Sequence, residues 1–280
     1  MSNQKFIGCD SDYKHADIVL FGAPYDGTVS FREGASGAPE AIRASSDDAI
    51  ETFSPYQDKD LDDLYVYDFG DLTFAHGSPE KMVETVEQCT REIIADDKLP
   101  VMIGGEHLVT LGAVSALYEK YPDLHIITLD AHADLRDEYL GQRLSHATVM
   151  RRVYDVVGSG RLFQFGIRSG ERTEFEWAKK YGSLHKFDFS DIATAIYQTS
   201  GSPVYLSIDL DVLDPATLPG TGTPEAGGVS FDELLDAIIK LSDCNIVGAD
   251  ITELSPPCDT SGVSTIVACK VLRELLVAIG

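Results

Sequence analysis

The sequence has few of the features that mark secreted, membrane-spanning or disulfide-rich proteins. Only 5 of its 280 residues are cysteine, with no C-x-x-C pair, so we expect reduced thiols and a cytoplasmic protein. No apolar run reaches about 18 residues, so we expect no membrane-spanning helix. The first residues lack a basic stretch followed by an apolar one, so we also expect no signal peptide.

Basic residues are scarce as well. The chain has 22 Lys and Arg against 46 Asp and Glu, which gives a net charge of −24. Such a field repels nucleic acid and anionic membranes, so we expect neither as a partner, and it attracts cationic ligands. The alternative interpretation is an ordinary protein of an acidic proteome. A phosphate-binding G-x-x-x-x-G-K-[ST] loop is also absent from the sequence, so chemistry on phosphate groups is disfavoured.

Short β-rich apolar runs alternate with longer segments of helical period. The expected strands are 17–21, 64–67, 101–103, 124–129, 162–165, 184–187, 204–208 and 246–249. The expected helices are 39–45, 79–95, 109–121, 146–156, 171–181, 192–198, 231–241 and 260–279. This alternation predicts an α/β fold, either a closed barrel or an open doubly wound sheet. No linker divides the chain, so we predict a single domain over residues 1–280.

The segment Asp130-Ala131-His132-Ala133-Asp134 directly follows the expected strand 124–129. Residues two apart in an extended segment share a face, so the carboxylates and the imidazole should point one way and the alanines the other. Unpaired carboxylates at the end of a buried strand carry a large desolvation cost, so a cation should lie among them. The alternative is a solvated turn after a strand.

Two further segments supply groups of the same kind. Asp209-Leu210-Asp211 closes the expected strand 204–208, and His107 follows the expected strand 101–103 through two glycines. The carboxyl ends of parallel strands meet at one edge of an open sheet, where these side chains can converge. The combined set is too large for one tetrahedral ion but fits two divalent ions with bridging carboxylates. The predicted metal ligands are His107, Asp130, His132, Asp134, Asp209 and Asp211.

Other titratable residues are candidates for substrate binding and proton transfer. His146 begins the expected helix 146–156, and it is the acid–base candidate because histidine titrates near neutrality; helix capping is the alternative role. Asp250 and Glu253 follow the last expected strand, and one of them should meet a cationic substrate because neither is needed for metal balance.

Two loops rich in glycine and proline, 22–39 and 219–228, are expected near the same edge. Long structured loops at the carboxyl edge of a sheet usually line a site, although the first of these could be a plain connector. Asp68 and Asp71 follow the expected strand 64–67 without a histidine. We predict that these two carboxylates brace a loop rather than serve a site.

Several motifs, in this order along the chain, resemble the ureohydrolase family of arginases and agmatinases. They are Gly104-Gly105-Glu106-His107, Asp130-Ala131-His132-Ala133-Asp134, Ser207-Ile208-Asp209-Leu210-Asp211 and Pro219-Gly220-Thr221-Gly222-Thr223-Pro224-Glu225. The resemblance implies a three-layer α/β/α sandwich around a parallel eight-stranded sheet, two Mn²⁺ ions per subunit and a homo-oligomer, either a trimer or a hexamer. It also implies that Asp130 and Asp209 bridge the ions, that His107 and Asp134 complete one metal position, and that His132 and Asp211 complete the other.

The same resemblance implies a mechanism. Two cations would lower the pKa of a bridging water, and the resulting hydroxide would attack a guanidinium carbon held by Glu253. His146 would then carry a proton to the leaving amine. The predicted catalytic set is therefore His146, Glu253 and the metal ligand Asp134.

The substrate is expected to be a small cationic guanidine. The stretches Asp134 to Tyr139 and Gly166 to Gly170 resemble agmatinases more than arginases, which favours cleavage of agmatine to putrescine and urea. An acidic rim including Asp137 and Glu138 should disfavour a substrate that carries a carboxylate. Arginase, guanidinobutyrase, formiminoglutamase and aminopropylagmatine ureohydrolase activities are alternatives, and so is an inactive regulatory member of the family.

Overall fold

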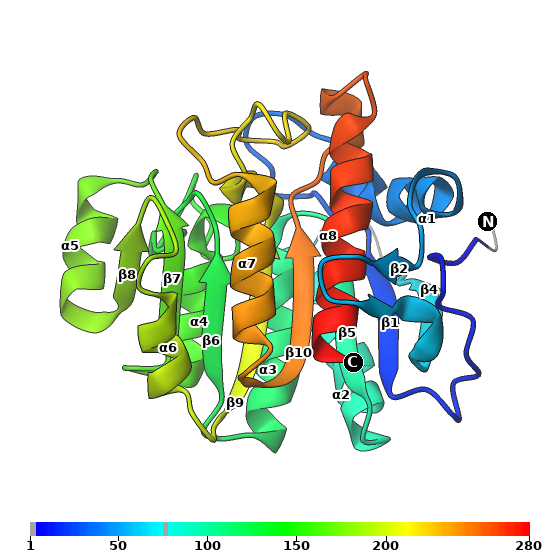
Figure 1. Cartoon of the computed structure of the whole chain (residues 1–280). Coiled ribbons are helices and arrows are strands. Elements are labelled where there is room, and N and C mark those ends of the chain that lie inside the picture. The colour runs from blue at the N-terminus through cyan, green and yellow to red at the C-terminus, as the bar shows by residue number, and fades with distance from the viewer. Residues whose placement is uncertain (1–3, 75–77) are drawn as a thin grey trace.

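A single open sheet forms the centre of the computed structural model, which describes residues 4–74 and 78–280 (Figure 1). The sheet has eight strands in the order β4-β1-β5-β10-β9-β6-β7-β8, and every neighbouring pair is parallel. The strands are β1 (Ile18–Ala23), β4 (Val66–Asp71), β5 (Leu99–Gly104), β6 (His125–Leu129), β7 (Leu162–Ile167), β8 (Ser183–Lys186), β9 (Pro203–Asp209) and β10 (Asn245–Thr252).

Helices cover both faces of this sheet, as Figure 1 shows. One layer contains α1 (Ala38–Ala49), α8 (Val263–Ile279), α7 (Phe231–Leu241) and α6 (Ile192–Gln198), which pack in that order. The opposite layer contains α2 (Pro79–Ala95), α3 (Thr110–Lys120) and α4 (Val149–Val157), and α5 (Arg172–Tyr181) packs beside β8 at the sheet edge. The three-layer α/β/α sandwich is therefore confirmed, and the closed barrel is excluded.

The apolar runs explain why the strands lie between two helical layers. Every residue of β1 and of β9 is buried, as expected for parallel strands covered on both faces. Alternate residues of β1 enter different cores: Ile18 and Leu20 pack into one, and Val19 and Phe21 into the other. Among the described residues, no helix is both long and apolar enough to cross a membrane.

The predicted elements all exist, with some corrections at their ends. The sequence did not predict a short hairpin of β2 (Phe53–Ser54) and β3 (Lys59–Asp60), because two-residue strands carry almost no periodicity. Asp68 and Asp71 lie within β4 and not after it, so their predicted location is wrong. Both pair with the buried side chain of Arg43 on α1, so they have a structural role as predicted, but they brace a helix rather than a loop.

The strand order brings distant parts of the sequence together. β5, β10, β9 and β6 are adjacent in the middle of the sheet, and their carboxyl ends point to the top of Figure 1. The chain passes from β5 to β6 and leaves a gap that β9 and β10 later fill. The segments that follow these four strands therefore meet at one edge, where ligands bind in open α/β sheets.

Candidate metal centre and active site

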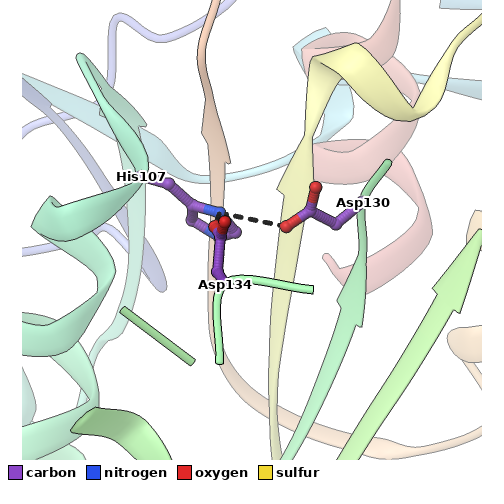
Figure 2. Close-up of side chains that lie close together, drawn as sticks. All are labelled: His107, Asp130 and Asp134. Atoms are coloured by element: carbon purple, nitrogen blue, oxygen red, sulfur yellow. Dashed lines mark ion pairs between the residues drawn. The ribbon is translucent and has the colours of Figure 1, made fainter. Parts of the chain in front are cut away.

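One group of side chains that could hold a metal ion surrounds His107 (Figure 2). Its Nδ1 lies 3.3 Å from a carboxylate oxygen of each of Asp130, Asp134 and Asp209. These residues come from the ends of β5, β6 and β9. The convergence predicted from the strand ends is thus present for this half of the set.

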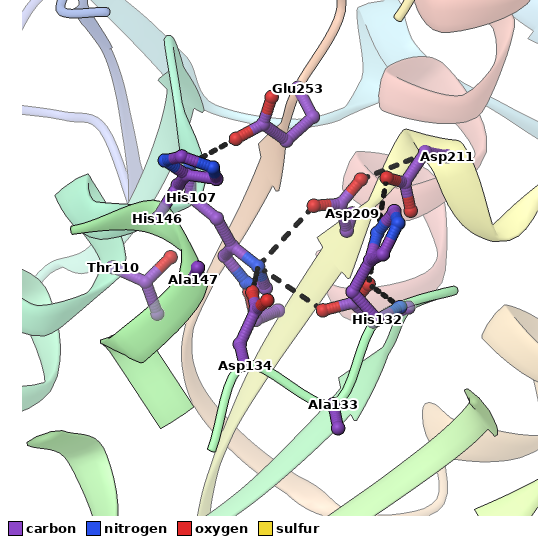
Figure 3. A network of polar contacts seen from close by, with 12 residues as sticks. His107, Thr110, His132, Ala133, Asp134, His146, Ala147, Asp209, Asp211 and Glu253 are labelled. Atoms are coloured by element: carbon purple, nitrogen blue, oxygen red, sulfur yellow. Dashed lines mark hydrogen bonds and ion pairs between the residues drawn. The ribbon is translucent and has the colours of Figure 1, made fainter. Parts of the chain in front are cut away.

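The second group surrounds His132. Its Nδ1 lies 2.9 Å from Asp211 Oδ2 and 3.8 Å from Asp130 Oδ1. Asp130 belongs to both groups, with Oδ2 toward His107 and Oδ1 toward His132. Figure 3 shows the labelled side chains of His107, Asp134, Asp209, His132 and Asp211, with those of Glu253 and His146, around the same space.

The local backbone differs from the extended segments that the sequence predicted. β6 ends at Leu129, before the first ligand, and Asp134 has a left-handed backbone with φ of 51°. Asp209 ends β9, and its Oδ1 accepts the backbone N–H of Asp211 at 2.9 Å, at the start of a 3₁₀ turn. Turns, rather than a shared strand face, therefore aim these carboxylates at one another.

His107 needs a sharp turn after β5, and Gly105 permits it. A Cβ atom at Gly105 would overlap the backbone of Tyr25. The close approach lets the N–H of Glu106 donate to Tyr25 O at 2.8 Å. The two chain segments are thereby fastened together beside the metal ligand, and only glycine fits at this position.

The two groups have the chemistry of a cation site. Asp130 is completely buried, and its Oδ2 and His107 Nδ1 have no hydrogen-bond partner within the described residues. Burial, with repulsion from neighbouring carboxylates, raises the pKa of Asp134 to about 7 and that of Asp209 well above its usual value. Burial opposes the charged form of His132, but Asp211 raises the pKa of His132 to about 10. A divalent cation would satisfy these crowded groups.

The predicted choice between Asp250 and Glu253 is resolved by their positions. Glu253 lines the cavity beside the two groups, and its Oε1 accepts the N–H of His107 at 2.7 Å. Asp250 lies behind the metal ligands and accepts hydrogen bonds from three buried hydroxyl groups. One of these belongs to Ser207, whose Oγ lies 3.0 Å from Nε2 of His107. Asp250 therefore supports a ligand and does not face the cavity.

His146 also lines this cavity, which has a volume of about 240 Å³. The cap of the following helical turn is Ser145, which forms a capping box with Thr148, so His146 is not needed as a cap. Burial lowers the pKa of His146 to about 4, and its imidazole is neutral near pH 7. The sequence could not distinguish these two roles, whereas the structure leaves the imidazole available to the cavity.

The prediction that Asp137 and Glu138 belong to an acidic rim of the cavity is wrong. Neither residue lines the cavity, and Asp137 instead pairs with Arg152 at 2.7 Å. Two further carboxylates that line the cavity are those of Glu171 and Glu174, which follow β7. Sequence reasoning missed both, although their place after a strand was the available signal.

The two glycine-rich loops lie at the site as predicted. Ser30 from the first and Thr223 from the second line the cavity. The guanidinium of Arg32 joins the loops by donating to backbone carbonyl oxygens of the second, including Gly222 O at 3.3 Å. Arg168 similarly donates to Asp211 O and Glu225 O, each at 2.8 Å. These two arginines fix the loops around the metal ligands.

Comparison with known proteins identifies this arrangement. Residues 16–278 match the model of the arginase family, and the chain belongs to this family of metal-dependent hydrolases. The agmatinase of Bacillus cereus is 42% identical over 98% of this chain and 96% of its own length. The solved agmatine ureohydrolase of Thermoplasma volcanium has a TM-score of 0.91 and 35% identity, covering 100% of this chain and 95% of its own. Proclavaminate amidino hydrolase from Streptomyces clavuligerus has a TM-score of 0.88 at 30% identity, covering 100% of this chain and 97% of its own. The protein is therefore an enzyme, a ureohydrolase of the agmatinase type.

Proposed function

We propose that this enzyme hydrolyses agmatine to putrescine and urea with two Mn²⁺ ions bound. The observation that carries the proposal is the position of Glu253, a buried carboxylate in the cavity wall beside two His/Asp groups that share Asp130. A planar guanidinium pairs well with a carboxylate and remains charged at any working pH. The similarity to proteins named agmatinase or agmatine ureohydrolase favours agmatine as the guanidine.

The residues that would hold the ions are those of the two groups. His107 and Asp134 would bind one ion, His132 and Asp211 the other, and Asp130 and Asp209 would lie between them. For Asp130 this is supported by its presence in both groups, whereas Asp209 has one oxygen near His107 and the other on the Asp211 N–H. When bound, the ions would supply hydroxide at neutral pH by lowering the pKa of water.

Glu253 would then orient the substrate, and His146 would transfer the proton. Oε1 of Glu253 already accepts a backbone N–H, which fixes the carboxylate so that its other lone pairs can orient the substrate guanidinium. His146 is neutral, so it can hold a proton released in the reaction and deliver it to the leaving amine. Asp134 faces the same space and contributes a further acceptor beside the reacting carbon.

The charge of the cavity lining favours a substrate that ends in an amine. Glu171 and Glu174 belong to the lining, and the one arginine of the lining, Arg136, already pairs with them at 3.1 and 3.5 Å. The carboxylate of arginine would have to enter without a free cationic partner among these described residues. Agmatine presents an ammonium group instead.

The test is kcat/KM for urea release from agmatine, arginine, guanidinobutyrate and formiminoglutamate, with Mn²⁺ added. We expect agmatine to exceed arginine by about a hundredfold or more, because each 1.4 kcal/mol is a factor of about ten. Comparable turnover of arginine would contradict the substrate assignment. The five free cysteines agree with the proposed cytoplasmic location, and a trimer or hexamer remains our expectation for light scattering of the purified protein.

A further inference from the structure

The imidazole of His146 is held by side chains of the loop after β1 and of the segment that precedes α4. The proposed reaction does not otherwise use these side chains. Its Nδ1 lies 3.4 Å from Thr28 Oγ1 and 3.3 Å from Ser145 Oγ. Its Nε2 lies 3.3 Å from Oγ of Ser30, which lines the cavity. Tyr139 packs edge-on to the ring, with the centroids 5.8 Å apart. Nε2 is therefore the ring nitrogen on the cavity side.

The hydroxyl hydrogen of Thr28 is committed to a different partner. Thr28 Oγ1 donates to Glu106 Oε1 at 2.5 Å, and the Thr28 N–H donates to Glu106 Oε2 at 2.8 Å. Glu106 is fully buried, and Thr28 supplies both of these hydrogen bonds. The carboxylate therefore fastens the loop after β1 and leaves the Thr28 oxygen only its lone pairs to offer.

Two groups of His146 approach those lone pairs. The backbone N–H of His146 donates to Thr28 Oγ1 at 3.0 Å, and the nearby Nδ1 meets the same oxygen. A protonated Nδ1 would donate a hydrogen bond to this oxygen. An unprotonated Nδ1 would instead place its lone pair against a lone pair of Thr28 Oγ1, which is repulsive. The Ser145 hydroxyl can rotate either to accept this proton or to donate to a bare Nδ1, so Thr28, whose hydrogen is already used, is the neighbour that distinguishes the two tautomers.

We propose that Thr28, held by Glu106, is a positioning residue that fixes neutral His146 as the Nδ1–H tautomer, with a bare Nε2 directed at the cavity. Glu106 lies next to His107 in sequence, but its carboxylate is turned to the loop after β1 and serves the acid–base residue rather than a metal. The tautomer assignment follows from these hydrogen bonds with Glu106 as the ionised carboxylate that accepts from Thr28. Its catalytic consequence rests on the proposed function, in which Nε2 takes up and returns the proton.

The first test compares Thr28→Val, which removes the hydroxyl, with Thr28→Ser, which keeps it. We expect kcat for agmatine to fall about tenfold to a hundredfold in Thr28→Val, a part of the usual contribution of general acid–base catalysis. KM, bound metal and melting temperature should stay near those of the unmodified enzyme, and Thr28→Ser should restore most of kcat. Thr85→Val, which removes a threonine hydroxyl from α2, is the matched control and should change nothing.

Glu106→Gln gives an independent variant. A glutamine amide has one oxygen and cannot accept both from the Thr28 hydroxyl and from the Thr28 N–H as the carboxylate does, so we expect the same selective fall in kcat. A folded, metal-loaded Thr28→Val enzyme with unchanged kcat would overturn the proposal. So would parallel losses of kcat, metal and stability in both variants, because those indicate a purely structural role.

The second test does not depend on activity. Long-range ¹H–¹⁵N spectra of ¹⁵N-histidine protein loaded with Zn²⁺, assigned with His146→Ala, report which ring nitrogen carries the proton. We expect Nδ1–H in the unmodified enzyme and a mixture of tautomers in Thr28→Val, whereas Nε2–H in the unmodified enzyme would overturn the proposal. If no guanidine yields urea, the proposed function fails, while this spectrum still decides the tautomer.

Discussion

Asp130 is the residue on which both candidate metal positions depend, because its two oxygens face the two His/Asp groups. We predict that Asp130→Asn loses both ions, since the amide removes the negative charge that both positions share and replaces one of the two oxygens with an NH₂ group. His107→Ala should spare part of the binding. Elemental analysis of dialysed protein measures this, with Asp47→Asn, an exposed change on α1, as the control. Two tightly bound ions in Asp130→Asn would refute the shared role.

Glu253 separates substrate binding from structure. In Glu253→Gln, the amide oxygen can keep the hydrogen bond from His107, but the NH₂ group would then face the guanidinium. We predict a loss of about 3–4 kcal/mol of transition-state stabilisation, roughly a hundred- to a thousandfold in kcat/KM, with metal content and melting temperature kept.

The control for Glu253 is Glu138→Gln, which changes an exposed glutamate outside the cavity. It should leave kcat/KM unchanged. A Glu253→Gln enzyme that is less stable yet nearly fully active per folded molecule would show that this carboxylate only braces the end of β10.

Among the loops, Arg168 connects the segment after β7 to the turn that carries Asp211. Its guanidinium reaches Asp211 O, Val212 O and Glu225 O together, which the single ammonium of lysine cannot reproduce. We predict that Arg168→Lys weakens metal binding by about ten- to a hundredfold, as is usual when a supporting partner of a ligand is lost. Metal titration of the chelated protein measures the affinity, and Arg172→Lys in the first turn of α5 is the control. Unchanged metal affinity would mean that the conformation of this turn does not depend on Arg168.

The secondary elements were predictable because each has a strong local pattern. Helix α2 starts with Pro79 and buries Met82, Val86 and Ile93 at helical spacing. The strands were equally clear, because parallel strands buried on both faces read as apolar runs. The barrel and the open sheet could not be told apart from periodicity, because both use the same βα units; the family resemblance supplied the answer.

The site was predictable in its members but not in its geometry. Ligand types at strand ends identified His107, Asp130 and Asp211, yet the turns at Asp134 and Asp209 depend on hydrogen bonds that residue spacing does not encode. Contacts between segments far apart in the sequence could not be predicted at all. The contact between Thr28 and His146, which are 118 residues apart in sequence, is an example, and the exclusion of Asp137 from the cavity is another.

For the whole molecule, we expect the crowded buried carboxylates to make the free energy of unfolding depend on bound metal. We predict that chelation lowers the melting temperature by about 5 °C, because an ion at about a hundred times its Kd adds roughly 2.7 kcal/mol to the free energy of unfolding. Differential scanning calorimetry before and after adding Mn²⁺ measures the shift. The same chelator should not shift Asp130→Asn. An unmodified enzyme that melts at one temperature with and without chelator, fully active in both, would exclude a metal centre.

The central claim is that this molecule cleaves the guanidinium group of agmatine hydrolytically. The direct measurement is the amount of urea and of putrescine formed from agmatine by the Mn²⁺-loaded protein. The two products should appear in equal amounts, vanish after chelation and return when Mn²⁺ is restored. Consumption of agmatine with release of ammonia in place of urea, or no consumption of it by a metal-loaded, folded protein, would contradict the account.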